Sequence, residues 1–264
     1  MPGPACRDVV SVAGDELRFA GHRLFLNGIN IAWISYAGDT NASASRGFGM
    51  ATYCGWEEAL RFVSRNGGNS VRVWLLNEPH ESLLWDEDRV LGLRHDVIPM
   101  AQALLEAAAR LDVFVVLVLF NGAFVRKVDC PLFGSAATLD SLTTKVVRPL
   151  AAALRDYNSL AMWEVINEPE GMVDPALIVP PELAPAATSC PGPSDGAGWS
   201  KDCLLPLVHV QRFINRVAAA IRSEDSWHLL TAGAWHICTT TEGAYSGEMG
   251  AGTGRGWWLG RRLG

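Results

Sequence analysis

One segment, residues 160–171 (LAMWEVINEPEG), constrains the fold of this chain more than any other. Its first half is a near-continuous apolar run, which is the pattern of a parallel strand that is buried on both faces. The run stops at Asn167-Glu168-Pro169, and pairing must end there because proline cannot donate to a strand ladder. Glu168 is therefore predicted to lie at the carboxyl end of a buried strand, which in an α/β barrel is the rim that carries catalytic groups.

The same tripeptide occurs a second time, at Asn77-Glu78-Pro79. It also follows a run typical of a strand, residues 69–76 (NSVRVWLL), but it leads into a charged segment, PHESLLWDEDR. A three-residue motif is weakly specific, so one of the two matches is expected to be accidental. We interpret Glu168 as the functional carboxylate and Glu78 as a surface residue.

Apolar runs that are typical of strands alternate along the chain with segments of helical periodicity. We expect a hairpin at 9–20, strands at 23–30, 69–76, 113–120, 160–167 and 228–235, and helices at 56–66, 96–111, 139–156 and 205–223. This alternation predicts right-handed βαβ units and a parallel sheet. Neither GxGxxG nor a Walker motif is present, so a nucleotide-binding fold has little support.

The residues at the ends of the expected strands favour a barrel over an open sheet. In a barrel, five polar or aromatic residues would share one rim: Asn30, Trp74, Asn121, Glu168 and Trp235. The fold class predicted from the sequence is therefore α/β, of the (β/α)8 barrel type.

Composition excludes several classes of partner. The net charge of −6 and the lack of a basic run give no electrostatic basis for binding nucleic acid or an anionic membrane. No apolar stretch has transmembrane length, and MPGPACRDVV lacks the long apolar segment of a signal peptide. The six cysteines and six histidines form no metal-binding pattern, so neither a metal nor a cofactor is expected.

Residues 173–202, rich in Pro, Ala, Ser and Gly, read as a long loop within the folded unit. Cys190 and Cys203 flank its Gly-Ala-Gly-Trp segment, and we predict a disulfide between them because closing this loop would restrict the unfolded chain.

A rim of this kind suits glycoside hydrolysis, which needs carboxyl groups beside the scissile bond and aromatic faces on which sugars stack. The chain has ten tryptophans, and four fall at predicted strand ends or in loops beyond them: Trp33, Trp74, Trp199 and Trp235. Each of them could equally be a core residue. Arg72 lies inside a strand, where an unpaired charge is costly, so we expect a carboxylate partner within the barrel. A purely structural ion pair with Glu164 is the alternative.

These segments together resemble glycoside hydrolase family 5, specifically its β-mannanases of the invertebrate type. The resemblance covers roughly residues 9–236 and is carried, in order, by 25–39 (FLNGINIAWISYAGD), 67–75 (GGNSVRVWL), 121–123 (NGA), 163–171 (WEVINEPEG), 196–199 (GAGW) and 218–235. Asn-Glu-Pro is shared by many related hydrolases, whereas its combination with GGNSVRVWL and GAGW is much more specific.

The resemblance implies a (β/α)8 barrel and retaining endo-hydrolysis of β-1,4-mannan by an extracellular monomer. Glu168 would match the general acid/base, Asn167 the asparagine beside it and Arg72 the arginine of the second strand. The residues expected to contact the polysaccharide are Trp33, Tyr36, Trp74, Asn121, Trp199 and Trp235.

The chain departs from the family pattern after about residue 236. Residues 237–264 are Gly-rich and contain no apolar run ending in glutamate, and Glu242 and Glu248 are their only carboxylates. We therefore expect a partial barrel of about five β/α units over 1–236, a tail outside the family over 237–264, and no identifiable nucleophile. Retaining hydrolysis needs a nucleophile, so we do not expect mannanase activity from the chain as given. Two alternatives remain open: an inactive fragment that binds glycan, and an endo-β-1,4-glucanase of the same family.

Overall fold

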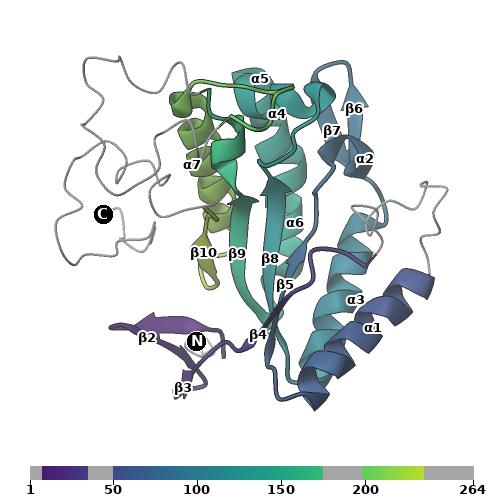
Figure 1. Cartoon of the computed structure of the whole chain (residues 1–264), viewed down its shortest axis with the longest axis vertical. Coiled ribbons are helices and arrows are strands. Elements are labelled where there is room, and N and C mark those ends of the chain that lie inside the picture. The colour runs from purple at the N-terminus through teal and green to yellow at the C-terminus, as the bar shows by residue number, and fades with distance from the viewer. Residues whose placement is uncertain (1–7, 35–49, 175–197, 235–264) are drawn as a thin grey trace, which may run out of the picture.

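A five-stranded parallel sheet forms the centre of the molecule. The computed structural model describes residues 8–34, 50–174 and 198–234, drawn in colour in Figure 1. The sheet has the order β10-β9-β8-β5-β4 and consists of β4 (Gly28–Asn30), β5 (Ser70–Trp74), β8 (Phe114–Asn121), β9 (Leu160–Asn167) and β10 (Leu229–Thr231). Every neighbouring pair is parallel, as the sequence predicted.

Helices pack side by side against one face of this sheet (Figure 1). They are α1 (Met50–Arg65), α3 (Val97–Arg110), a continuous helical segment of α5 (Ala136–Leu142), η2 (Thr143–Val147) and α6 (Arg148–Leu154), and α7 (Leu207–Glu224). The element η2 is a turn of π-helix that directly precedes Arg148-Pro149. The expected helix at 139–156 thus exists, and its irregularity falls where Pro149 removes a backbone donor.

The residues of β5 and β9 alternate between the helical layer and the opposite face of the sheet. Val71, Val73, Trp163 and Val165 are buried in the hydrophobic core. The residues between them, including Arg72 and Glu164, therefore point to the other face. Packing of the apolar positions thus directs the charged positions to the side of the sheet that faces away from the helices.

Two small antiparallel elements accompany the central sheet. A three-stranded sheet comprises β1 (Ser11–Ala13), β2 (Glu16–Phe19) and β3 (His22–Leu24), and a hairpin comprises β6 (Leu83–Asp86) and β7 (Arg89–Leu93). The single strand expected at 23–30 is wrong, because its halves belong to different sheets, β3 and β4. The charged segment that begins at Pro79 forms α2 (Pro79–Ser82) and this hairpin.

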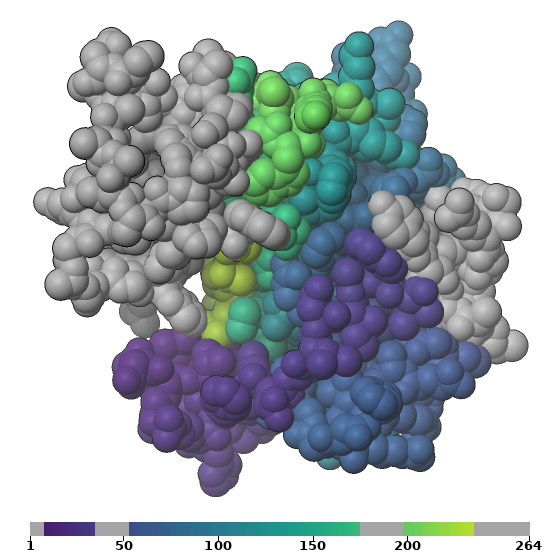
Figure 2. Space-filling model, viewed as in Figure 1, coloured from purple at the N-terminus to yellow at the C-terminus, as the bar shows by residue number. Residues whose placement is uncertain are grey.

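The N-terminal segment crosses the face of the molecule in front of the elements that follow α1, as the space-filling view shows (Figure 2). In the described residues the sheet is not closed into a barrel, and β4 and β10 form its two edges. The boundary expected at residue 236 and the tail at 237–264 lie outside the described residues. None of the described helices has the length and apolar character needed to cross a membrane.

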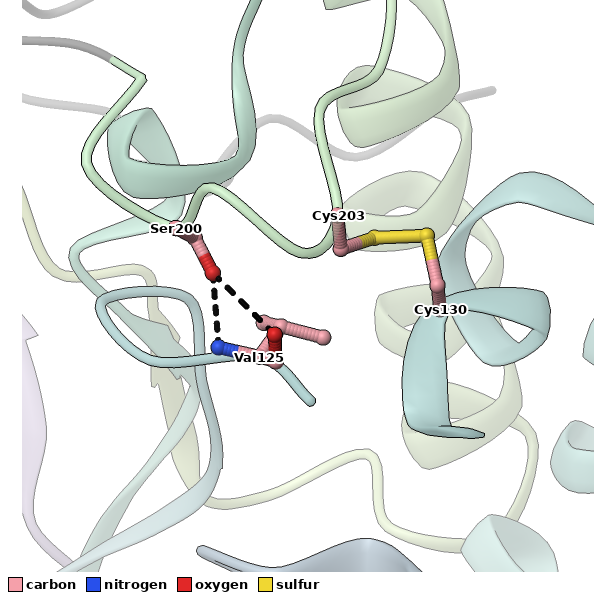
Figure 3. The surroundings of a disulfide bond; sticks show 4 residues. All are labelled: Val125, Cys130, Ser200 and Cys203. Carbon is pink, nitrogen blue, oxygen red and sulfur yellow. Dashed lines mark hydrogen bonds between the residues drawn. A yellow bond between two sulfur atoms is a disulfide. The ribbon is translucent and has the colours of Figure 1, made fainter. Parts of the chain in front are cut away.

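A disulfide joins Cys130 to Cys203, with Cα atoms 5.4 Å apart (Figure 3). It connects α4 (Cys130–Gly134) to the segment that leads into α7, and the Val125 backbone N–H donates to Ser200 Oγ (2.6 Å) close by. The predicted pairing of Cys203 with Cys190 is therefore wrong. Proximity in sequence favoured Cys190, whereas packing of α4 against α7 brings Cys130 to Cys203.

Candidate active site

Glu168 lies at the carboxyl end of β9, as predicted, and its backbone has a left-handed conformation (φ 46°, ψ 58°). This conformation is uncommon for a residue with a side chain and is concentrated at functional sites. The Gly122 backbone N–H donates to the Asn167 carbonyl (2.7 Å), and that of Gly171 donates to the Glu168 carbonyl (3.1 Å). A Cβ at Gly122 would lie 2.6 Å from the Glu168 carbonyl oxygen, so only glycine permits this close approach.

A hydrogen-bonded network centred on Arg72 includes Asn167, the residue that precedes Glu168. Arg72 Nε donates to Glu164 Oε2 (2.8 Å) and its Nη2 donates to Glu164 Oε1 (2.5 Å). The same guanidinium donates to Asn167 Oδ1 (2.8 Å) and to Asn30 Oδ1 (3.0 Å). The ion pair with Glu164, the alternative left open by the sequence, is thus present, and Arg72 also fixes the residue that precedes Glu168.

Asn121 orients the other side of the Asn167 amide. Asn167 Nδ2 donates to Asn121 Oδ1 (3.0 Å), which also accepts the backbone N–H of Ala123 (3.1 Å). Asn121 and Asn167 are both buried. Because the oxygen and the nitrogen of the Asn167 amide each have a partner, its side chain is held in one orientation beside Glu168.

Two tryptophans line the space in front of this network. The rings of Trp33 and Trp74 meet edge to face with centroids 5.3 Å apart. Arg72 Cζ lies 5.4 Å from the centroid of the Trp74 ring, within the range of a cation–π contact. Trp33 and Trp74 therefore form an aromatic surface next to the polar network, of the kind on which sugar rings stack.

The tryptophans, Glu168 and the loops after β5 and β8 enclose a cleft of about 400 Å³, within the size range of ligand sites. Its lining residues are Trp33, Trp74, Asn77, Glu78, Pro79, Asn121, Ala123, Phe124, Val125, Arg126, Asp129, Phe133 and Glu168. Glu78, which we interpreted as an unrelated surface carboxylate, thus lies in the same cleft as Glu168. The sequence could not reveal this because the shared rim places both loops together only in the folded sheet.

Arg126 is surrounded by three carboxylates at one end of the cleft. Its Nε lies 3.0 Å from Asp129 Oδ2, and its Nη1 lies 3.1 Å from Glu78 Oε2 and 3.6 Å from Glu81 Oε1. Burial raises the pKa of Asp129, although the hydrogen bond and charge of Arg126 partly oppose this shift. Sequence reasoning missed Arg126 and Asp129, since no motif marks them.

The remaining predicted contact residues are only partly described. Tyr36 and Trp235 lie outside the described residues. Trp199 lies next to the turn that follows Glu168, since a Cβ at Gly171 would be 2.8 Å from Trp199 Nε1, but it is not among the residues that line the cleft. In the part of the chain that the structure describes, no cluster of His, Cys, Asp or Glu could hold a metal ion.

Comparison with known proteins gives specific relatives. No family model matches the chain. The mannan endo-1,4-beta-mannosidase of Mytilus edulis is 32% identical over 241 residues, which are 90% of this chain and 64% of the relative. The protein of the same name from Cryptopygus antarcticus is 32% identical over 247 residues, 89% of this chain and 60% of the relative. The chain therefore spans less than two thirds of the length of either relative.

Solved structures agree with these relatives. The β-mannanase of Mytilus edulis superposes with a TM-score of 0.73 at 30% identity, over 86% of this chain and 63% of that one. The endo-1,4-beta-mannanase of Eisenia fetida gives 0.74 at 28% identity, over 87% and 62%. The resemblance identified from the sequence motifs is thus confirmed: over the aligned residues, the chain is similar in sequence and in fold to invertebrate β-mannanases.

Proposed function

We propose that this chain is a mannan endo-1,4-β-mannosidase-type glycoside hydrolase that acts on β-1,4-linked mannan through the cleft at the carboxyl edge of its sheet. The observation that carries the proposal is the position of Glu168, held in a left-handed turn at the end of β9 and at the wall of a cleft lined by Trp33 and Trp74. The relatives that carry this activity by name support it.

In this proposal Glu168 is the general acid/base. It would protonate the glycosidic oxygen as the bond to the leaving sugar breaks, and it would later remove a proton from the attacking water. Asn167 would hold a sugar hydroxyl close to the reacting bond, because Arg72 and Asn121 fix both ends of its amide. Retaining chemistry also requires a second carboxylate about 5–5.5 Å away as nucleophile, and we assign no residue to that role.

We also propose that the five-stranded sheet corresponds to the first β/α units of a (β/α)8 barrel. Its strand order and the alternation of strands with helices support this assignment. An extracellular location is proposed as well. The Cys130–Cys203 disulfide supports it, because disulfides persist mainly in oxidising compartments. A monomer acting on neutral polysaccharide remains our expectation.

The test is the release of reducing ends by purified chain 1–264 from galactomannan, glucomannan and carboxymethylcellulose, side by side. Hydrolysis, which needs a second carboxylate besides Glu168, should favour the two mannan-containing polymers over carboxymethylcellulose. The reverse preference would favour the endoglucanase alternative. Binding of mannan oligosaccharides without hydrolysis, measured by calorimetry on the same sample, would favour the glycan-binding alternative and refute the proposed catalysis.

A further inference from the structure

The second Asn-Glu-Pro segment has no part in the proposed catalysis, yet it forms one wall of the same cleft. Asn77, Glu78 and Pro79 all line the cleft that contains Glu168. The opposite wall of this part of the cleft, which we call the arm, comes from the loop after β8, through Phe124, Arg126 and Asp129. The arm is thus built by the ends of two adjacent strands, β5 and β8.

Several buried polar atoms of this arm have no hydrogen-bond partner. They are Trp74 Nε1, Asn77 Oδ1, Arg126 Nη2 and Asp129 Oδ1. Asp129 is only 2% exposed, and although its carboxylate accepts a backbone hydrogen bond from His80, its Oδ1 has neither a partner nor contact with bulk solvent. Buried polar groups in native proteins almost always have a partner, and an exception often marks a position that a ligand or an ordered water fills.

The chemistry of these atoms fits sugar hydroxyl groups. Two of them are donors (Trp74 Nε1 and Arg126 Nη2), and two are acceptors (Asn77 Oδ1 and Asp129 Oδ1). A hydroxyl group donates one hydrogen bond and accepts others, so neighbouring hydroxyls of one sugar ring can pair with both kinds. A carboxylate or phosphate ligand could satisfy only the donors.

Charge and shape agree with a neutral sugar. Arg126 faces Glu78, Glu81 and Asp129, which leaves an excess of negative charge at this end of the cleft. This excess disfavours anionic polysaccharides. Phe124 is 77% exposed although it lines the cleft. An exposed aromatic ring at a polar cleft offers an apolar surface to the face of a sugar ring.

We propose that Asn77, Phe124, Arg126 and Asp129 form a subsite that binds one neutral sugar of the polysaccharide next to the unit cleaved at Glu168. The inference rests on the proposed glycan substrate but not on hydrolysis. Phe124 supplies the stacking surface, and the polar side chains accept from and donate to the hydroxyl groups. Glu78 positions Arg126 from the side of the β5 loop.

The test measures the affinity of the full chain for β-1,4-mannohexaose by calorimetry, in a Glu168→Gln background that prevents cleavage. Phe124→Ala and Asn77→Ala should each weaken binding about five- to tenfold, as expected from the loss of one aromatic or hydrogen-bonding contact. Phe62→Ala is the control for Phe124, because Phe62 is 63% exposed on α1 and does not line the cleft. Asn66→Ala is the control for Asn77, because Asn66 is exposed just after α1 and does not line the cleft.

Unchanged affinity in both cleft variants, with mannohexaose bound by the Glu168→Gln chain, would overturn the subsite and leave the proposed substrate intact. The same would follow if the controls weakened binding equally, or if urea unfolding showed that the loss of affinity merely tracked a loss of stability. If the Glu168→Gln chain bound neither mannohexaose nor cellohexaose, the subsite and the proposed substrate would both be refuted.

Discussion

The two Asn-Glu-Pro segments show how one tripeptide takes on different chemistry in one sheet. Each follows a parallel strand, β5 or β9, and each places glutamate before a short helix that begins with proline, α2 or η3 (Pro169–Met172). Their backbones differ: Glu168 has φ 46°, whereas Glu78 has φ −115° and ψ 85°. The tripeptide therefore specifies only that a strand ends and a turn begins.

Contacts from neighbouring strands and loops determine how firmly each segment is held. Both polar ends of the Asn167 side chain are hydrogen-bonded, whereas Asn77 Oδ1 has no partner. The segment after β9 is held by the Arg72–Glu164 pair on one face of the strand and by the hydrogen bond from Trp163 to Asp225 on the other. The segment after β5 relies on Arg126, from the loop after β8. The first arrangement suits a fixed catalytic group and the second an adaptable binding surface.

The largest expected difference is in the rate of mannan hydrolysis between variants of the two glutamates. Glu168→Gln should lower the rate of mannan hydrolysis by roughly 10²–10⁴-fold, because a general acid contributes about that much. Glu78→Gln should change kcat by less than about tenfold, because Glu78 is paired with Arg126 and acts on binding. Reducing-end assays on galactomannan with both variants measure this contrast. A larger loss for Glu78→Gln would mean that the two roles are reversed.

The disulfide should matter more for the wall of the cleft built by the β8 loop than for the turn at Glu168. It closes a separation of 73 residues, so removing it should cost roughly 4 kcal/mol in the chain-entropy model. The double variant Cys130→Ala/Cys203→Ala is measured by urea unfolding, with the exposed free Cys54→Ala as control. Amide exchange should rise in 127–134 more than in 160–168. A loss below about 1 kcal/mol would contradict the expectation.

The disulfide also shows where sequence reasoning fails. The positions of four of the five strands, their parallel pairing and the place of Glu168 follow from apolar runs and from Pro169, which are local signals. The partner of Cys203 depends instead on the packing of α4 against α7, which no local pattern encodes. The same holds for Arg126 and Asp129, which enter the cleft only because the loops after β5 and β8 are adjacent.

The error at residues 23–30 has a different cause. The run RLFLNGIN is apolar enough for one strand, but Asn27 interrupts it: its backbone N–H donates to Asn69 Oδ1 (2.7 Å) and its carbonyl accepts the Asn69 N–H (2.7 Å). These bonds end one sheet and begin the other. Arg72, by contrast, was predictable, because a charge inside a buried strand requires a carboxylate partner wherever the chain folds.

Loss of Arg72 should be more costly than loss of Arg126. Arg72→Met would leave the Glu164 carboxylate, whose side chain is 6% exposed, without its ion-pair partner, and we expect a loss of about 3 kcal/mol. Arg126 is itself 38% exposed, and its buried partner Asp129 also accepts a backbone hydrogen bond from His80, so Arg126→Met should cost less, about 2 kcal/mol. Urea unfolding of both variants near neutral pH gives the two values. Equal losses would show that the two segments are held equally firmly.

The last comparison concerns the other face of β9, where the contribution to stability depends on pH. Asp225 is fully buried, and its Oδ2 accepts from Trp163 Nε1 (2.8 Å) and lies 2.7 Å from His228 Nδ1. Burial alone would raise the pKa of Asp225, but the hydrogen bonds and charge of His228 and the hydrogen bond from Trp163 outweigh it and lower the pKa to about 2.

A carboxyl whose folded pKa is depressed contributes stability above its unfolded pKa, and this stability is lost as the pH falls through the folded value. The Asp225 contribution, about 2 kcal/mol, should therefore be complete above roughly pH 5 and disappear between about pH 4 and pH 2. Urea unfolding of the unsubstituted chain and of Asp225→Asn at pH 6, 4 and 2.5 measures it, with Asp140→Asn, an exposed partner of Arg216, as control. The stability gap between the chain and Asp225→Asn should narrow on acidification. A gap that stayed constant would show that the charge of Asp225 does not anchor β9.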